Sequence, residues 1–345
     1  MADKLSYHEQ QKIKNTKKLR ELLNDLPTLC ETFFRGISQT TATRTQIAYA
    51  IDLKVFFEYL LENHRYFKGK QMYDIKKNDL NRIESEDIER FLEYLQLYEK
   101  DGVEITNNER AIKRKLAALR SFYNYFYRNK LVDANPAEQV LMPKIHDKAI
   151  VRLDPNEVAT LLDNVENANL TSYKKLKPRE LAILTLLLGT GIRVSECVGL
   201  DIEDVDFDND RIKIVRKGGY EAFVYFGQEV RDELLNYIRI RKNILPANEN
   251  DEHALFLSSQ RKRLCVRSVE MLVKKHAQTV TTVKKITPHK LRSTYGTSLY
   301  QETGDIYLVA SVLGHKDVNT TRKHYADMLD ESQRQAKDKV TLREK

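Results

Sequence analysis

The clearest hydrophobic pattern in the first part of the chain has the 3.6-residue period of amphipathic helices. The expected helices cover residues 5–25 (mainly charged), 43–62, the stretch from 85 onward, and 107–129. Ser85 is the expected N-cap of the third of these, because acidic residues follow it directly. Pro136 then breaks the helical pattern, and residues 143–148 form an expected exposed, basic linker. The first part of the chain is therefore predicted to be all-helical.

The second part of the chain mixes the helical period with the two-residue period of β-strands. Asp154 is the expected N-cap of its first helix, with Pro155 in the first turn. A buried helix over residues 179–188 is expected to end at Gly189-Thr190-Gly191. Alternating residues over 211–216 and 222–226 flank Gly218-Gly219 and predict a β-hairpin. Further helices are expected over residues 228–242 and 267–278, and over most of the chain from 288 onward.

Length and pattern together predict two domains, since 345 residues are long for one core and comfortable for two. We place the first domain at residues 1–143, a linker at 144–152 and the second domain at 153–345. The expected fold class is mainly α with a small β-sheet (α+β).

Composition is compatible with a polyanionic partner. The net charge is +8, and 31% of the residues are charged, which fits nucleic acid and equally fits a solvated basic surface. The three cysteines (Cys30, Cys197 and Cys265) are far apart, which argues against disulfides and zinc knuckles and for a cytoplasmic protein with reduced thiols. The N-terminus lacks an apolar signal-peptide region, and the apolar run at residues 184–189 is far too short to span a membrane.

The helix predicted over residues 107–129 carries the strongest local charge. Between Arg110 and Lys130 it holds seven basic residues and no acidic ones, together with five aromatic residues. We expect the aromatic residues to form a core stripe. The basic residues form either a solvated face or a phosphate-binding surface, and the absence of acids favours the second. The residues expected to contact DNA are Lys113, Arg114, Lys115 and Arg120.

Candidate chemistry is concentrated near the C-terminus, where His289, Arg292, His315 and Tyr325 follow one another, with Arg193 about a hundred residues upstream. The sequence offers no G-x-S-x-G turn, no paired acids at a fixed spacing and no cysteine–histidine metal cluster. Guanidinium groups bind phosphate oxygens with forked geometry, and a phenol becomes nucleophilic beside a base and positive charge. The set predicts a tyrosine that attacks a phosphodiester held by two arginines, with no cofactor or metal.

These residues resemble the pattern of the tyrosine recombinase and integrase family. That pattern has an arginine in G-x-R-x-S-E, a lysine at a hairpin tip, H-x-x-R, a G-H segment and a final tyrosine. All six positions are filled in the family's order, by Arg193, Lys217, His289, Arg292, His315 and Tyr325. The resemblance is detailed from about residue 153 to 325 and looser before that. One departure is Ser293, because many relatives have histidine there, and this weakens assignment to a particular subfamily.

The resemblance implies a role for each residue. Tyr325 would form a 3′-phosphotyrosine bond, His289 would assist its proton transfer, and His315 would donate a hydrogen bond to the phosphate. Lys217 would protonate the leaving 5′-oxygen, with Arg216 and Lys213 as weaker candidates. Glu196 is expected to orient an arginine. The tyrosines nearest to these motifs, expected to pack in the core instead, are Tyr295, Tyr300 and Tyr307.

The resemblance also implies an assembly. An N-terminal core-binding domain and a C-terminal catalytic domain would form a C-shaped clamp around double-stranded DNA. A homotetramer on two DNA sites would exchange strands through a Holliday junction, with residues 327–345 docking on a neighbouring protomer.

Within the family the chain looks most like a Xer-type chromosome-dimer resolvase of the stand-alone, single-recombinase kind, which leaves room for an accessory division or DNA-translocase protein. A mobile-element integrase is the main alternative, and a type IB topoisomerase fits the motif spacing less well. Two other classes stay open: a non-catalytic DNA-binding regulator on the same scaffold, and a metal hydrolase built on His289 and His315.

Overall fold

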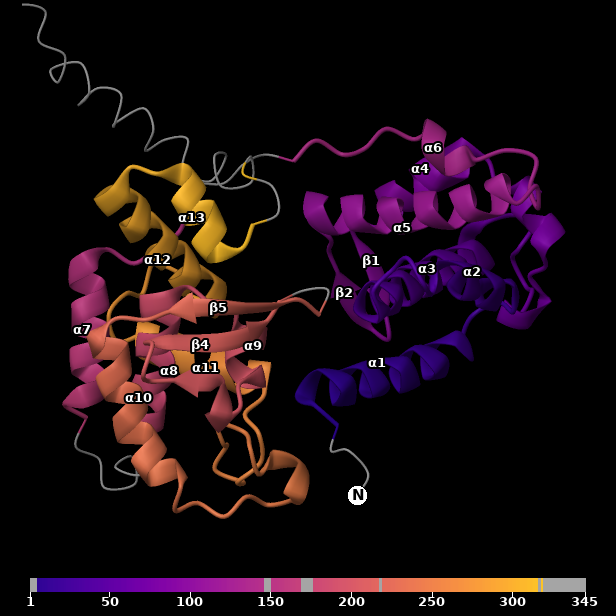
Figure 1. Cartoon of the computed structure of the whole chain (residues 1–345). Helices are drawn as coiled ribbons and strands as arrows, with labels where there is room; N and C mark the ends of the chain where they lie inside the picture. Colours follow the sequence, from indigo (N-terminus) through magenta and orange to yellow (C-terminus); the bar gives the residue numbers. More distant parts are fainter. Residues whose placement is uncertain (1–4, 146–149, 169–175, 217–218, 316–317, 319–345) are drawn as a thin grey trace, which may run out of the picture. The chain divides into compact units, whose positions relative to one another are not determined.

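The computed structural model describes residues 5–145, 150–168, 176–216, 219–315 and 318. The chain divides into two compact units, residues 1–147 and residues 148–345 (Figure 1). None of the described helices is long and apolar enough to cross a membrane.

Unit 1 is helical apart from one short hairpin. Its helices are α1 (Tyr7–Leu23), α2 (Leu29–Ile37), α3 (Thr43–Asn63), α4 (Ser85–Tyr94), α5 (Glu109–Arg128) and α6 (Pro136–Gln139). Two 3-10 turns, η1 (Met72–Asp74) and η2 (Lys77–Arg82), precede α4, and the antiparallel hairpin β1 (Tyr98–Lys100) and β2 (Val103–Ile105) follows it. Helix α2 and this hairpin are not among the elements expected from the sequence.

The core of unit 1 is aromatic. Phe33 of α2, Phe57 of α3 and Phe122 of α5 are fully buried and meet edge to face, with ring centroids 5.3 and 5.9 Å from Phe122. The core-stripe prediction for α5 is confirmed for Phe122, Tyr123 and Phe126, whereas Tyr127 is half exposed. Edge-to-face pairs add to the burial energy of such rings, so α5 is fixed firmly on α3 and α2.

The start of α4 corrects one expectation. Its N-cap is Glu84, one residue before the predicted Ser85. The backbone N–H of Glu84 donates to Asp87 Oδ2 at 2.9 Å, so Asp87, three residues later, fixes the helix start.

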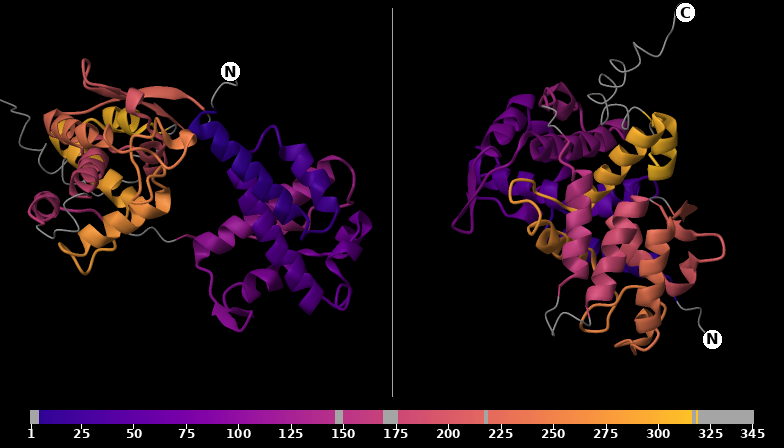
Figure 2. Two further views of the ribbon diagram at one scale, coloured as in Figure 1. Left: turned by 90° about the horizontal axis from the view of Figure 1, so that it is seen from below. Right: turned by 90° about the vertical axis from the view of Figure 1, so that its left-hand side faces the viewer.

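Unit 2 surrounds one apolar helix. The helices before the sheet are α7 (Pro155–Glu166), α8 (Lys177–Thr190) and α9 (Val194–Gly199), and those after it are α10 (Gln228–Arg241), α11 (Val266–Ala277), α12 (Pro288–Thr303) and α13 (Ile306–Leu313). Two 3-10 turns, η3 (Ile202–Asp204) and η4 (Glu249–Asp251), lie in the connections. Helix α8 is buried without a break from Glu180 to Leu187 and packs against α7, α10 and α12. Figure 2 shows α12 and α13, in yellow, next to each other.

The sheet of unit 2 has three antiparallel strands in the order β3 (Val205–Asp206), β4 (Arg211–Val215) and β5 (Glu221–Tyr225). Ile212 of β4 lies opposite Val224 of β5, and both side chains are buried. The predicted hairpin is therefore confirmed. Buried residues alternate with more exposed ones because successive side chains of a strand point to opposite faces of the sheet. Strand β3 is an addition that the sequence pattern does not predict.

Helix α8 ends within the predicted Gly189-Thr190-Gly191 segment. Its last residue is Thr190, and its C-cap is Gly191, whose φ of +63° is left-handed. A glycine is required there for a second reason, because a Cβ at this position would lie 2.4 Å from Tyr295 Cδ1 on α12. Gly191 thus lets the end of α8 approach α12 closely.

Candidate active site

Arg193 is held at the start of α9 by an acid one turn later. Its backbone N–H donates to Glu196 Oε2 at 2.7 Å, and its Nη1 donates to Glu196 Oε1 at 2.9 Å. Glu196 is only 5% exposed, whereas the Arg193 side chain is 36% exposed. The expectation that Glu196 orients an arginine is confirmed: a buried carboxylate fixes a guanidinium that still reaches the surface.

Arg292 lies on α12 and is almost fully buried. Its Nη1 donates to the carbonyl oxygen of Gly191 at 2.5 Å, and its Nη2 donates to the carbonyl oxygen of Leu313. The side chain therefore connects the end of α8 with the end of α13. Backbone carbonyls compensate for the burial of a charge that would otherwise be costly.

The C-terminal turn of α13 gathers three arginines. The carbonyl oxygens of Val312, Leu313 and Gly314 accept hydrogen bonds from Arg216 Nη2 at 3.1 Å, from Arg292 Nη2, and from Arg193 Nη2 at 3.4 Å, respectively. A helix C-terminus carries partial negative charge, which favours cations around it. His315 follows this turn, and its backbone N–H donates to Ala310 O at 2.9 Å. Arg193, Arg292 and His315 therefore come together from segments far apart in the sequence.

The remaining candidates stand as follows. His289 is exposed in the first turn of α12, one helical turn before Arg292, and its carbonyl oxygen accepts from Ser293 Oγ at 3.1 Å. Lys217 and Tyr325 lie outside the described residues, so their positions stay predictions. Lys213, on β4, has its Nζ 3.8 Å from Asp204 and 3.6 Å from Glu221.

The three tyrosines near the motifs differ in burial. Tyr300 is buried, and Tyr295 is partly buried, which raises the pKa of its phenol. The core-packing prediction holds for these two. It is wrong for Tyr307, which is 71% exposed on α13.

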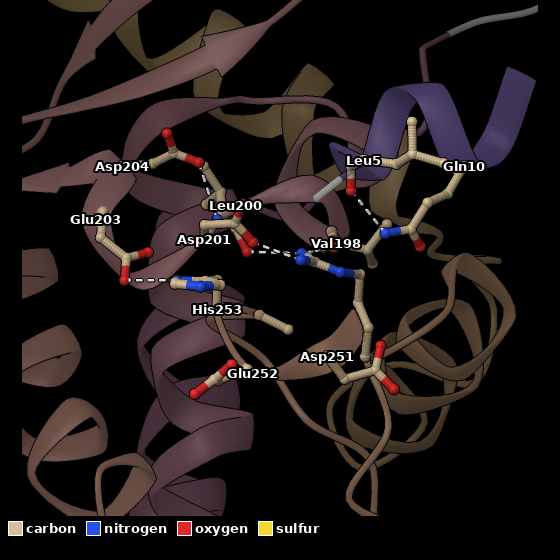
Figure 3. A network of polar contacts seen from close by, with 12 residues as sticks. Leu5, Gln10, Val198, Leu200, Asp201, Glu203, Asp204, Asp251, Glu252 and His253 are labelled. Carbon is tan, nitrogen blue, oxygen red and sulfur yellow. Dashed lines mark hydrogen bonds and ion pairs between the residues drawn. The ribbon is translucent and has the colours of Figure 1, made fainter. Parts of the chain in front are cut away.

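Arg193 lies at the start of α9, and a polar network holds the C-terminal end of the same helix. Arg263 Nη1 donates to the carbonyl oxygens of Val198 at 3.3 Å and Leu200 at 2.9 Å, and its Nη2 bonds to Asp201. Close by, His253 Nδ1 lies 2.9 Å from Glu203 Oε1 (Figure 3). Sequence reasoning missed these residues, because they are some 50 to 65 positions apart and belong to no motif. Among the residues that the structure describes, no group of three or more His, Cys, Asp or Glu could hold a metal ion.

Glu196→Gln is expected to slow the predicted DNA cleavage roughly 10- to 100-fold while the protein stays folded. The amide keeps the shape of the carboxylate but loses the charge that orients Arg193, and small misplacements of a positioning group have effects of this size. Rates of covalent-complex formation on a nicked duplex measure the change. Glu203→Gln, which breaks the exposed pair with His253, is the matched control, and an equal loss in both variants would contradict the assignment.

Three of the four predicted DNA-contacting residues of α5 (Arg114, Lys115 and Arg120) take part in protein contacts in unit 1. Arg114 Nη1 bonds to Asp52 Oδ2, and Lys115 Nζ lies 3.7 Å from Asp52 Oδ1 and donates to Asn107 at 3.0 Å. Arg114 is 46% exposed, whereas Asp52 and Lys115 are buried. Burial raises the pKa of the Asp52 carboxyl more than the two cations lower it.

Arg120 donates to the carbonyl oxygens of Ala137 at 3.1 Å and Val140 at 2.6 Å, and so connects α5 to the chain after α6. Lys115 and Arg120 would have to leave these bonds to reach a phosphate. DNA contact by the four cations, including the partly buried Lys113, stays a prediction.

Asp52→Ala is expected to destabilise unit 1 by about 3 kcal/mol, because it leaves the buried Lys115 ammonium without its counter-ion. Chemical denaturation of the wild type and the variant measures the difference. Asp25→Ala is the matched control, since the Asp25 and Lys54 side chains are 55% and 31% exposed and ion pairs that solvent reaches contribute less than about 1 kcal/mol. Similar losses in the two variants would show that burial of Asp52 does not matter.

Comparisons with known proteins give the family of the chain. Residues 151–332 match the model described as the phage integrase family, and residues 30–130 match its N-terminal SAM-like domain. Tyrosine recombinase XerC of Caldanaerobacter subterraneus subsp. tengcongensis is 32% identical over 92% of this chain and 87% of its own length. Tyrosine recombinase XerS of Streptococcus equi subsp. equi is 29% identical over 94% of this chain and 98% of its own.

Solved structures show the same fold. The XerH recombinase bound to its difH substrate superposes with a TM-score of 0.60 at 22% identity, covering 84% of this chain and 78% of XerH. The Tn1549 transposon integrase bound to transposon right end DNA superposes with a TM-score of 0.65 at 20% identity. The match covers 90% of this chain and 98% of the integrase chain. Family models, curated relatives and fold coincide, and the chain belongs to the phage integrase family: it is a tyrosine recombinase, an enzyme of DNA strand exchange.

Proposed function

We propose that this recombinase is of the Xer type and resolves chromosome dimers at a specific site on double-stranded DNA. One observation carries the proposal: Arg193 and Arg292 converge on the end of α13 beside His315. This convergence of the two arginines occurs in a chain that is similar over nearly its whole length to XerC and XerS proteins.

In the proposed cleavage step, Tyr325 attacks the scissile phosphorus while its proton passes to His289. The new bond joins the phenol oxygen to phosphorus, and the bond from phosphorus to the 5′-oxygen breaks. The 5′-oxygen leaves with a proton from Lys217. The products are a 3′-phosphotyrosine and a free 5′-hydroxyl, so the linkage energy is conserved and the strand can be rejoined without ATP.

The proposed roles of Arg193 and Arg292 follow from where charge develops. The phosphorane-like transition state carries extra negative charge on its non-bridging oxygens, and fixed guanidinium groups stabilise it most when they need no rearrangement. The carbonyls of α13 and the Glu196 carboxylate give both arginines that fixed geometry. His315, next to the same turn, would donate a further hydrogen bond to the phosphate.

The proposed assembly assigns DNA binding to both units. Residues 1–143 would form the core-binding domain, residues 144–152 the linker, and residues 153–345 the catalytic domain and tail, closing a C-shaped clamp on DNA. The net charge of +8 supports a polyanionic partner. A homotetramer on two sites in the cytoplasm, served by a division or DNA-translocase protein, completes the proposal.

Mapping the genomic site that the protein binds in cells tests the Xer role. A single locus near the replication terminus, with strand exchange between two copies of it in vitro, is the expected result. Binding at the ends of a mobile element would assign an integrase instead. Binding without any covalent complex would indicate a regulator. Strand cleavage that forms no covalent complex and stops in EDTA would indicate a metal hydrolase.

A further inference from the structure

Arg216 stands where the β4–β5 hairpin meets the end of α13. Its backbone N–H donates to Tyr220 O at 2.8 Å, and its carbonyl oxygen accepts from the Gly219 N–H at 3.0 Å, so its main chain closes the hairpin. The side chain crosses to another element, because Nη2 donates to the carbonyl oxygen of Val312 at 3.1 Å. Arg216 therefore connects two elements that are almost a hundred residues apart in the sequence.

The guanidinium of Arg216 lies directly against Gly314. A Cβ at position 314 would be 1.3 Å from Arg216 Nη1 and 2.2 Å from Cζ, and the φ of Gly314 is +61°. Glycine is thus needed twice here, for the left-handed turn after α13 and for the approach of the arginine. The Nε of Arg216 is buried and has no hydrogen-bond partner among the described residues. The guanidinium thus lies against the turn although its Nε gains no hydrogen bond from a described residue.

The turn that Arg216 holds is the one that holds the two phosphate-binding candidates. Val312, Leu313 and Gly314 are consecutive, and their carbonyl oxygens accept from Arg216, Arg292 and Arg193 in that order. A shift of this turn therefore moves the acceptors of both other arginines. We propose that Arg216 is a positioning residue that sets Arg193 and Arg292 on the scissile phosphate through the C-terminal turn of α13. The inference rests on the proposed function, in which those two arginines bind the phosphate.

A change in phosphate charge tests this role. Arg216→Met keeps the length of the side chain but removes its charge and hydrogen bonds. On a nicked duplex with a normal scissile phosphodiester, we expect covalent-complex formation to slow by on the order of 100-fold. A methylphosphonate at the same position has a methyl group in place of one non-bridging oxygen and is neutral. The methylphosphonate gives the arginines less charge to stabilise. On this substrate Arg216→Met should therefore slow covalent-complex formation only a few-fold.

A double-mutant cycle separates positioning from direct contact. If Arg216 acts partly through Arg292, then the combined loss in the double variant of Arg216→Met and Arg292→Met is smaller than the product of the two single losses. Gly314→Ala should reproduce the Arg216→Met defect with the arginine intact, since the new methyl group displaces the guanidinium. Gly304→Ala is its control, because Gly304 has a similar φ of +65° but nothing within 4 Å of the added Cβ. Arg211→Met, at the start of β4 and paired with Asp206, should behave like the wild type.

Three outcomes would overturn the inference: no slowing in Arg216→Met, equal slowing on both linkages, or additive losses with Arg292→Met. A wild-type protein that forms no covalent complex on the phosphodiester would instead reject the proposed function. The two failures are therefore distinguishable in one set of reactions.

Discussion

Tyr325→Phe is expected to abolish covalent attachment to DNA, with a loss of at least about 10⁴-fold in cleavage, because a nucleophile has no substitute in this reaction. The phenylalanine keeps the ring and removes only the oxygen that would bond to phosphorus. A nicked duplex traps the adduct, since the short strand beyond the nick diffuses away. The adduct is then measured as a slowly migrating band on a denaturing gel.

The control for Tyr325→Phe is Tyr307→Phe, because Tyr307 is the most exposed of the neighbouring tyrosines that the structure describes. It should form the adduct at the wild-type rate. DNA binding by Tyr325→Phe should stay within a few-fold of wild type, which shows that only chemistry is lost. An adduct that persists in Tyr325→Phe and disappears in Tyr307→Phe would move the nucleophile to α13.

Local patterns predicted the elements that depend on local physics. The period-2 runs around Gly219 gave the hairpin, because alternate side chains such as Ile212 and Val224 meet one buried face. The helical period gave α3, α5 and α10 to within two residues at each end. Helix α2 was missed although its apolar residues Phe33 and Phe34 are buried. Its nine residues are too few for a clear period, and packing on α5 supplies its stability.

The arrangement around α13 could not be predicted in the same way. Motif spacing selected Arg193, Arg292 and His315, but not the carbonyl oxygens that orient the two arginines. Those contacts join residues as many as 121 positions apart. Every residue has a backbone carbonyl, so the sequence does not show which carbonyls act as acceptors. The same holds for Asp52, which pairs with Arg114 across 62 residues. The number of basic residues on α5 does not show which of them form ion pairs with Asp52 on α3.

Arg292→Lys is expected to lower cleavage by about 10² to 10³-fold, even though the charge is kept, because one ammonium cannot replace a planar fork of donors. In the free protein Arg292 bonds to two carbonyl oxygens, of Gly191 and Leu313. A lysine can reach only one of them at a time, so the end of α8 and the end of α13 lose their connection. The measurement is the rate of covalent-complex formation at saturating protein.

This substitution also lowers stability, and a second buried arginine separates the two effects. Arg241 is 3% exposed and donates to the carbonyl oxygens of Ala254 and Glu252 at 2.9 and 2.6 Å. Arg241→Lys should therefore lose a similar amount of unfolding free energy, roughly 1–3 kcal/mol, and cleave DNA at nearly the wild-type rate. If both variants lose stability and activity in the same proportion, Arg292 acts through the fold. If only Arg292→Lys loses activity beyond its stability, the guanidinium itself acts on the phosphate.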